Sequence, residues 1–168
     1  TAVNSQTQLR MIDGGLISLT PLSQLNISQY DFDTKTSEGS VALSLIKGGL
    51  RTVTGLLTNK TKNYQLSTPV ASIGVRGTHY SAYIDNDDLL LAVWDGEIIV
   101  QVTVGKSPIQ FELGKNLSYS MARVKSNGEV EYLSQTPPQL ALGHTLESLV
   151  TTTNPNHNFP EQSPLFNH

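Results

Sequence analysis

Short stretches in which apolar and polar residues alternate run from about Gln8 to Leu133. Turns that contain glycine or aspartate separate these stretches. Alternation places one set of side chains on each face of an extended strand, and half-buried strands of this kind build sheets. The pattern therefore predicts an all-β domain. Only 15% of the residues are charged, which agrees with this class because helical domains are usually richer in Glu, Lys and Ala.

Three stretches show the predicted strands most clearly. Residues 41–45 alternate strictly. Residues 98–104 place four β-branched side chains on one face and Ile99, Gln101 and Thr103 on the other. Both faces are apolar from Leu89 to Trp94. We expect this last strand to be buried on both sides, near the centre of a sheet.

The spacing of the turns limits which architectures are possible. Many short strands joined by such turns are typical of a sandwich, a barrel or an irregular solenoid. No unit of fixed length repeats residue by residue, which excludes a regular repeat array. We predict a twisted stack of short strands, either a β-sandwich or an irregular β-solenoid.

The sequence changes character near its C-terminal end. A Pro-Pro pair at 137–138 ends the strand pattern, and residues 139–150 carry leucine and valine at near-helical spacing. We predict one β-domain over residues 1–134, then a short docking helix and an extended Asn- and Pro-rich tail over residues 135–168. The expected anchors of the tail, on this domain or on a neighbouring molecule, are Phe159, Leu165 and Phe166.

Charge and cysteine content exclude several classes of protein. The net charge is −3 and the basic residues are scattered, so the basic face of a nucleic-acid-binding protein is missing. The absence of cysteine excludes disulfides, thiolate zinc sites and thiol nucleophiles. No apolar run approaches the roughly 20 residues that cross a bilayer. We expect no nucleic-acid partner and no transmembrane segment in this chain.

The sequence motifs of common enzymes are also missing. The four histidines, at positions 79, 144, 157 and 168, are not spaced to share a metal ion. The chain contains no nucleophile elbow, phosphate-binding loop or dinucleotide-binding glycine motif. We predict that the protein is not an enzyme and needs no cofactor.

An acidic turn is the one candidate metal site. Asp85, Asp87 and Asp88 offer the hard oxygen ligands that calcium prefers. The turn lacks the glycine and the distal glutamate of an EF-hand loop. We favour an acidic hairpin turn without metal over a calcium site.

The most informative segment is Thr68–Thr78, TPVASIGVRGT. Gly74 and Gly77 permit left-handed or crowded backbone, and Arg76 between them can reach carbonyls or a carboxylate with a planar group of five donors. We predict a structural joint at which the chain turns between sheets, with Arg76 as an internal brace. The alternative is that Arg76 clamps an anion or a carboxylate of a ligand.

This segment is one of three motifs that occur in order. TPVASIGVRGTHYSAYI is preceded by GGLRTVTGLL at residues 48–57 and followed by LLLAVWDGEIIV at residues 89–100. Together they closely resemble the FecR domain family of bacterial envelope proteins over about residues 8–117. We expect the opening strands of the family domain either to be missing or to lie before Thr1. The motif positions to which we assign structural roles are Gly48, Gly49, Arg51, Gly74, Arg76, Gly77, Thr78, Trp94 and Gly96.

The resemblance implies a periplasmic all-β domain that binds protein partners and catalyses nothing. The chain looks closest to stand-alone, exported FecR-like proteins, so the implied partner is another envelope protein, such as a protease, an adhesin or a receptor. A role in biofilm or adhesin control would follow. The alternative within the family is the ectodomain of a sigma-factor regulator that senses a TonB-dependent receptor.

Two further interpretations stay open. The chain could be a carbohydrate- or peptidoglycan-binding module that stacks aromatic rings on sugars, although strand alternation directs some of these rings into the core. An exposed sheet edge or the tail could also join copies into an edge-paired or tail-mediated homo-oligomer. The aromatic candidates are Tyr30, Tyr64, Tyr83, Trp94 and Tyr119.

Overall fold

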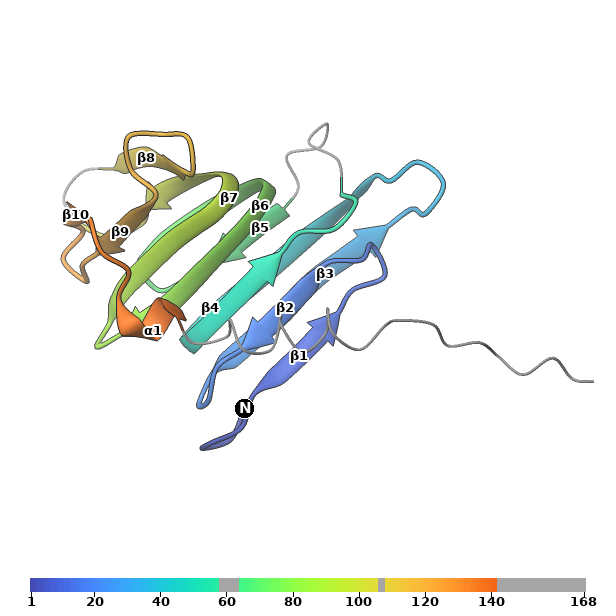
Figure 1. Cartoon of the computed structure of the whole chain (residues 1–168), viewed down its shortest axis with the longest axis horizontal. Helices are drawn as coiled ribbons and strands as arrows, with labels where there is room; N and C mark the ends of the chain where they lie inside the picture. Colours follow the sequence, from blue (N-terminus) through green and yellow to red (C-terminus); the bar gives the residue numbers. More distant parts are fainter. Residues whose placement is uncertain (58–63, 106–107, 142–168) are drawn as a thin grey trace, which may run out of the picture.

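The computed structural model describes residues 1–57, 64–105 and 108–141. In these residues ten strands form one sheet, and a single short helix follows them (Figure 1). All strand pairs are antiparallel except β4 with β5. The elements are β1 (Thr7–Arg10), β2 (Leu16–Leu19), β3 (Gln24–Phe32), β4 (Gly39–Val53), β5 (Tyr64–Ser67), β6 (Ala71–Asp85), β7 (Asp88–Val102), β8 (Ile109–Gly114), β9 (Met121–Val124), β10 (Val130–Tyr132) and α1 (Pro138–Ala141).

Three long strands, β4, β6 and β7, divide the sheet into two halves. Each has 15 residues and changes its pairing partners partway along. In half-sheet A the order is β3, the first part of β4, β5, the first part of β6, the last part of β7, and β8. In half-sheet B it is β1, β2, the rest of β4, the rest of β6, the first part of β7, β9 and β10.

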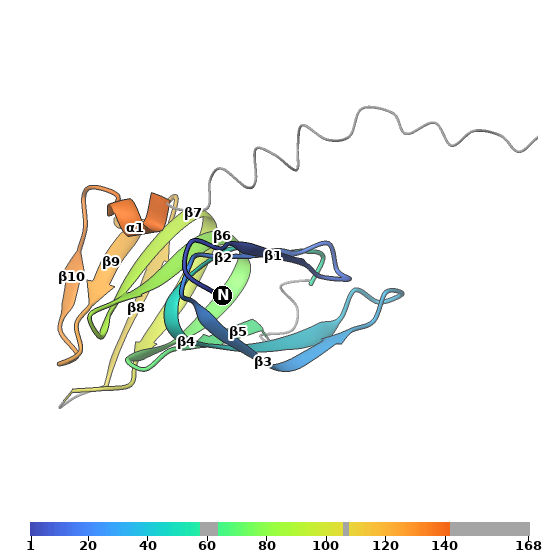
Figure 2. The same ribbon diagram turned by 90° about the horizontal axis from the view of Figure 1, so that it is seen from below.

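The hydrophobic core lies between the two half-sheets, which form separate layers in Figure 2. Leu43 and Ile73 come from half-sheet A, and Leu50 and Leu91 from half-sheet B; each is at most 2% exposed. Alternation explains this core, since every second residue of each strand points inward. The predicted all-β class is confirmed, and residues 89–93 are buried on both faces as expected.

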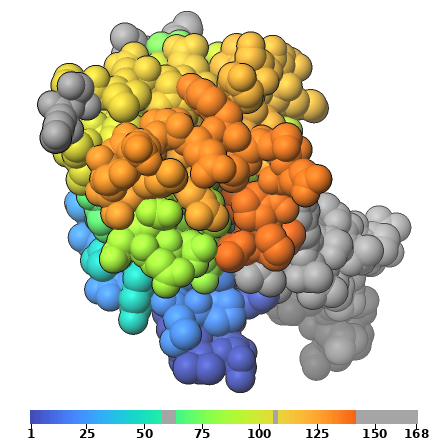
Figure 3. All heavy atoms as spheres, turned by 90° about the vertical axis from the view of Figure 1, so that its left-hand side faces the viewer, coloured from blue at the N-terminus to red at the C-terminus, as the bar shows by residue number. Residues whose placement is uncertain are grey.

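The short helix α1 covers part of the outer face of half-sheet B. It begins at the second proline of the predicted break, and Leu140 packs on Leu90 and Ala92. Figure 3 shows this end of the molecule, where α1, β9 and β10 surround the β6–β7 turn. No helix within the described residues is long and apolar enough to cross a bilayer. The predicted helix beyond residue 141 and the tail with Phe159, Leu165 and Phe166 lie outside the described residues.

Candidate functional site

The motif Thr68–Thr78 lies where half-sheet A passes into half-sheet B. Most of it belongs to β6, which continues to Asp85, so the joint is a bend within one strand. Arg76 pairs with Glu97 while His79 pairs with Asp95, and the register shifts again immediately after His79. Two successive irregularities therefore bend β6 and β7 together, because an extra residue in one strand bends and twists a sheet.

Two glycines with positive φ make this bend possible. Gly77 has φ 54° and Gly96 has φ 73°. A Cβ on Gly96 would fall on the carbonyl oxygen of Gly77, so no side chain fits there. Hydrogen bonds also tie the bend to the end of β4: the Thr78 amide donates to Thr54 Oγ1 at 2.8 Å, and the Thr54 amide donates to the Thr78 carbonyl at 3.0 Å.

Arg76 does not brace this joint, so that prediction is wrong. Ile73 and Val75 point into the core, and the alternation of β6 sends Arg76 to the exposed outer face of half-sheet A. Among the described residues, no hydrogen bond or ion pair holds its guanidinium. The side chain is available for a ligand.

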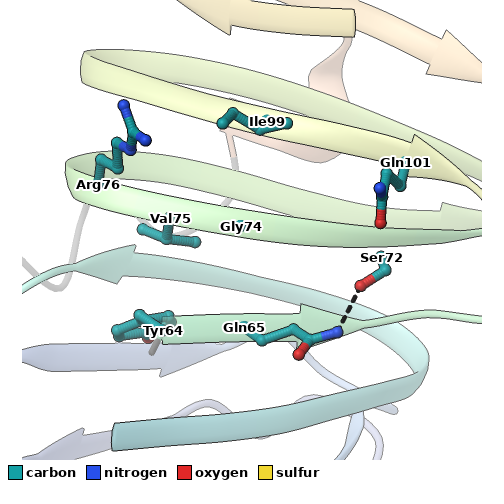
Figure 4. A pocket seen from close by; sticks show the side chains of 8 residues that line it. All are labelled: Tyr64, Gln65, Ser72, Gly74, Val75, Arg76, Ile99 and Gln101. Carbon is teal, nitrogen blue, oxygen red and sulfur yellow. Dashed lines mark hydrogen bonds between the residues drawn. The ribbon is translucent and has the colours of Figure 1, made fainter. Parts of the chain in front are cut away.

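A groove of about 260 Å³ lies beside Arg76 on this outer face. Gln65, Gly74 and Ile99 are cross-strand neighbours, so the groove spans β5, β6 and β7. In Figure 4 Arg76 stands at one end and Gln101 at the other. The lining residues are Tyr64, Gln65, Ser72, Gly74, Val75, Arg76, Ile99 and Gln101.

Apart from Arg76, and from Tyr64, whose hydroxyl lies beside those of Tyr80 and Thr52, the polar side chains of the groove are two amides and the Ser72 hydroxyl. The Gln65 Nε2 group donates to Ser72 Oγ at 2.6 Å, which fixes the two side chains across β5 and β6. The Gln101 amide donates to Gln110 Oε1 at 3.3 Å. Arg76 is the one lining residue with a formal charge. The groove can therefore form hydrogen bonds along its length and an ion pair at one end.

Gly74 keeps the groove open. It does not have a positive φ, and a Cβ placed on it would meet only the Ile99 carbonyl oxygen, at 3.9 Å. Our expectation that Gly74 permits a crowded backbone is therefore wrong, since the backbone there accepts a side chain. What the glycine provides is the hollow between Gln65 and Ile99.

A second arginine, Arg51, is buried on the outer face of half-sheet B. It is 3% exposed, and its guanidinium carbon lies 5.2 Å from the centroid of the Trp94 ring. The Trp94 indole N–H donates to Ser81 Oγ at 3.0 Å. A cation over an indole face is electrostatically favourable, more so when it is shielded from water. The internal brace is therefore Arg51.

The Gly48-Gly49 motif lies at the bend of β4, where its pairing passes from half-sheet A to half-sheet B. Gly48 has φ 73°. A Cβ on Gly49 would overlap the ring of Tyr83, its cross-strand neighbour on the outer face of half-sheet B. The absence of a side chain thus leaves room for the Tyr83 ring, which packs against the cluster of Leu90, Ala92 and Leu140.

The backbone conformation of the turn between β6 and β7 explains why Asn and Asp residues occupy it. Asn86 and Asp87 have φ of 48° and 71°, as in a two-residue hairpin turn in which Asn and Asp are preferred. Asp88 Oδ1 accepts from the Ser126 amide at 2.9 Å, and Asp85 Oδ2 accepts from Gln139 Nε2 at 3.4 Å. In residues 1–57, 64–105 and 108–141, no group of three or more His, Asp or Glu residues is placed to hold a metal ion.

Most of the aromatic candidates for sugar stacking have other contacts. Tyr30 donates its hydroxyl to Asp13 Oδ1 at 3.1 Å, and Tyr83 and Trp94 pack around Leu140. Tyr64 lines the groove but packs against the core. Tyr119 is 49% exposed, yet its ring stacks on that of Tyr132 with centroids 4.1 Å apart.

A cluster of hydroxyl groups lies inside the core behind the groove. Burial raises the pKa of Tyr80 well above 10.0, and burial also raises the pKa of Tyr64, whose hydroxyl lies beside those of Tyr80 and Thr52. Both phenols are therefore neutral near pH 7. They form a polar layer in the core and cannot act as bases there.

Sequence patterns could not identify the groove residues as a set. Alternation placed Ile99 and Gln101 on one face of their strand, and the structure agrees. Gln65 and Ser72 lie on β5 and β6, which form a hairpin joined by residues 68–70. The register that brings Ile99 beside Gly74 depends on the two irregularities that lie between this pair and the β6–β7 turn.

Comparison with known families gives a clear match. The profile of the family described as FecR protein matches residues 1–99, which contain nearly all of the three motifs. Residues 100–117, to which the resemblance was expected to extend, lie outside that match. No curated protein matches this chain.

Solved structures with a similar fold also exist. Two crystal structures of a protein from Parabacteroides distasonis ATCC 8503, described as a candidate anti-sigma factor, superpose with TM-scores of 0.53 and 0.54 at 17% sequence identity. The similarity covers 79% of this chain but 58% of the other, so this chain spans little more than half the length of that protein. At this identity the likeness concerns the fold alone.

Proposed function

The chain belongs to the FecR family, and on that basis we propose that it is a non-enzymatic regulatory module that binds a partner protein in the bacterial periplasm. The partner is another envelope protein, such as a protease, an adhesin or a receptor. By binding this partner, the module would regulate biofilm formation or adhesin processing. Family membership supports a regulatory role in signal transduction.

The observation that carries the binding role is the open groove on half-sheet A. It lies directly beside the bend that the family motif builds, so the fold holds its residues in fixed positions. The corresponding face of half-sheet B is occupied by α1 and by the Arg51–Trp94 contact. Of the two outer faces, the one on half-sheet A is therefore the better candidate for a partner.

A second candidate function is the sensor part of a sigma-factor regulator. The fold neighbour described as a candidate anti-sigma factor is longer than this chain, which covers 58% of it. In this alternative the groove would meet a TonB-dependent receptor. A sigma-factor gene next to the gene for this chain would favour the sensor role, and a neighbouring protease or adhesin gene would favour the first proposal.

Site-specific photo-crosslinking tests the binding role. A photoreactive amino acid at Gln101, at one end of the groove, should give a discrete adduct with one envelope protein in a periplasmic extract. The matched control places the same group at Glu131, an exposed residue of β10. Mass spectrometry of the adduct then separates a protease, an adhesin and a receptor.

Two results would contradict the proposal. The first is that photoreactive groups at Gln101 and at Glu131 give the same set of adducts. The second is that the group at Gln101 gives no adduct and that the unmodified protein also binds no envelope component. A triple variant, F159A/L165A/F166A, tests in the same assay whether the expected tail anchors contribute to binding. Loss of the adduct would support that expectation.

A further inference from the structure

We propose that the groove on half-sheet A recognises a carboxylate of an extended segment in the partner, and that Arg76 forms the ion pair. This inference rests on the proposed function, because it names the chemistry of the partner at the same site. The carboxylate can belong to an aspartate or glutamate side chain or to a chain terminus. A guanidinium pairs with either one through two parallel hydrogen bonds.

The first argument is that no residue in the described part of the chain forms an ion pair with Arg76. The nearest candidate for an internal ion pair is Glu97, its cross-strand partner on β7. No ion pair within 4.0 Å joins them. A Cβ placed on Gly114 would come within 2.9 Å of Glu97 Cγ, so the Glu97 side chain leans over Gly114, on the side of β7 away from Arg76.

The second argument is the shape of the groove. Ser72 and Arg76 are four residues apart on β6, which corresponds to about 13 Å along an extended strand. The volume of about 260 Å³ is close to the lower limit for a small-ligand pocket. A few extended residues fit this space. A globular surface would enter it only through a protruding segment.

The third argument is that the lining matches the groups of a short peptide. Gln65 and Gln101 offer amides that can pair with backbone N–H and C=O groups, and Ile99 offers an apolar contact beside Gly74. The single cation at one end selects a carboxylate at the matching end of the segment. The site combines a few oriented polar groups with an apolar contact, as peptide and small-ligand sites commonly do.

Nuclear magnetic resonance titration of the full chain tests this directly. The probes are acetyl-Ala-Ala-Glu-amide, acetyl-Ala-Ala-Ala with a free carboxylate, and the neutral acetyl-Ala-Ala-Gln-amide. We expect amide shifts at Gly74, Arg76 and Gln101 with one or both acidic peptides. The neutral peptide should bind about tenfold more weakly, as expected for loss of a hydrogen-bonded charge pair. The two acidic probes distinguish a side-chain carboxylate from a terminal one.

Three variants and one control locate the binding. Arg76→Gln should reduce affinity for the acidic peptide about tenfold, and Gly74→Leu should abolish the groove shifts by filling the hollow. Glu97→Gln should leave binding intact, since the Glu97 side chain leans over Gly114, away from Arg76. The matched control is Arg10→Ala, which removes an exposed arginine from β1. All four should keep the thermal unfolding midpoint of the parent chain.

The outcomes separate this inference from the proposed function. Equal binding of acidic and neutral peptides, shifts outside the groove, or groove shifts caused by chitotriose but not by the acidic peptides would overturn the carboxylate proposal. If Gln101 crosslinks to a partner and Arg76→Gln leaves that adduct unchanged, the partner-binding function stands and the carboxylate proposal is wrong. If the acidic peptide binds but no partner is captured, only the proposed function fails.

Discussion

The outer faces of the two half-sheets each carry an arginine from a family motif, and the two arginines have opposite surroundings. Arg51 on half-sheet B is buried over Trp94, whose indole is held by Ser81. Arg76 on half-sheet A is exposed at the end of an open groove. The comparison shows that a motif arginine near glycines can be buried within the fold or exposed at the edge of a groove. What covers the face of the sheet determines which.

The largest expected effect on stability distinguishes Gly96 from Gly74, two glycines of the β6–β7 strand pair. Gly96→Ala should destabilise the fold by about 2 to 4 kcal/mol, because the new Cβ meets the Gly77 carbonyl and the residue must keep a positive φ. Gly74→Ala is the matched control and should change stability by about 0.5 kcal/mol, towards greater stability. Urea unfolding of both variants measures the difference. Similar losses in the two would contradict the assignment of Gly74 to the groove.

The next effect concerns the buried arginine. Arg51→Ala should cost about 2 kcal/mol, since it removes the contact with Trp94 and leaves a cavity at a closed face. Arg51→Lys should recover part of that loss because the charge over the ring is kept. Thermal and urea unfolding give the values. If Arg51→Ala unfolds like the parent chain, Arg51 is not the brace.

A smaller effect depends on pH and lies in the core that both half-sheets share. Burial raises the pKa of Tyr80 in the folded chain, so the unfolded chain loses this proton first as pH rises through about 10. Stability should therefore fall above pH 10 and be unaffected by this group below about pH 9. Tyr80→Phe should reduce the fall by about 1 kcal/mol per pH unit.

The matched variant for this test is Tyr119→Phe, which removes an exposed hydroxyl. Urea unfolding at pH 8 and at pH 11 measures both variants against the parent chain. An identical alkaline loss in the parent chain and in Tyr80→Phe would show that Tyr80 contributes nothing to it.

The smallest effect on stability is expected at the exposed arginine. Arg76→Ala should change the free energy of unfolding by less than about 0.5 kcal/mol, as is usual for an exposed side chain on the surface of a sheet. Compared with Arg51→Ala, this variant is the sharpest test of the contrast between the two faces. A loss similar to that of Arg51→Ala would restore Arg76 as a structural residue.

The sequence was sufficient for the class of fold and for the position of the bend. Alternation identified the strands around residues 41–45 and 98–104, and the doubly apolar run at 89–94 indicated a buried central strand. It did not show that three strands are long enough to serve both half-sheets. Turn signals such as Gly48-Gly49 look the same whether the chain reverses or bends and continues.

The candidate site was much less accessible to sequence analysis. The exposed position of Arg76 follows from the alternation of Ile73 and Val75, which carries more information than the two flanking glycines. The groove itself depends on the register of β5 on β6 and of β6 on β7. β5 and β6 form a hairpin joined by residues 68–70, but two irregularities separate the Gly74–Ile99 pair from the β6–β7 turn, so alternation alone does not predict that Ile99 meets Gly74.

The continuity of β4, β6 and β7 across both halves has a consequence for how such a chain can evolve. A gene cut anywhere between residues 39 and 102 would leave each fragment with strands whose partners are encoded on the other. Neither half-sheet could be duplicated, exchanged or lost without the other. Recombination within this span would therefore separate paired strands, whereas β1 with β2 and β9 with β10 form short local pairs outside it.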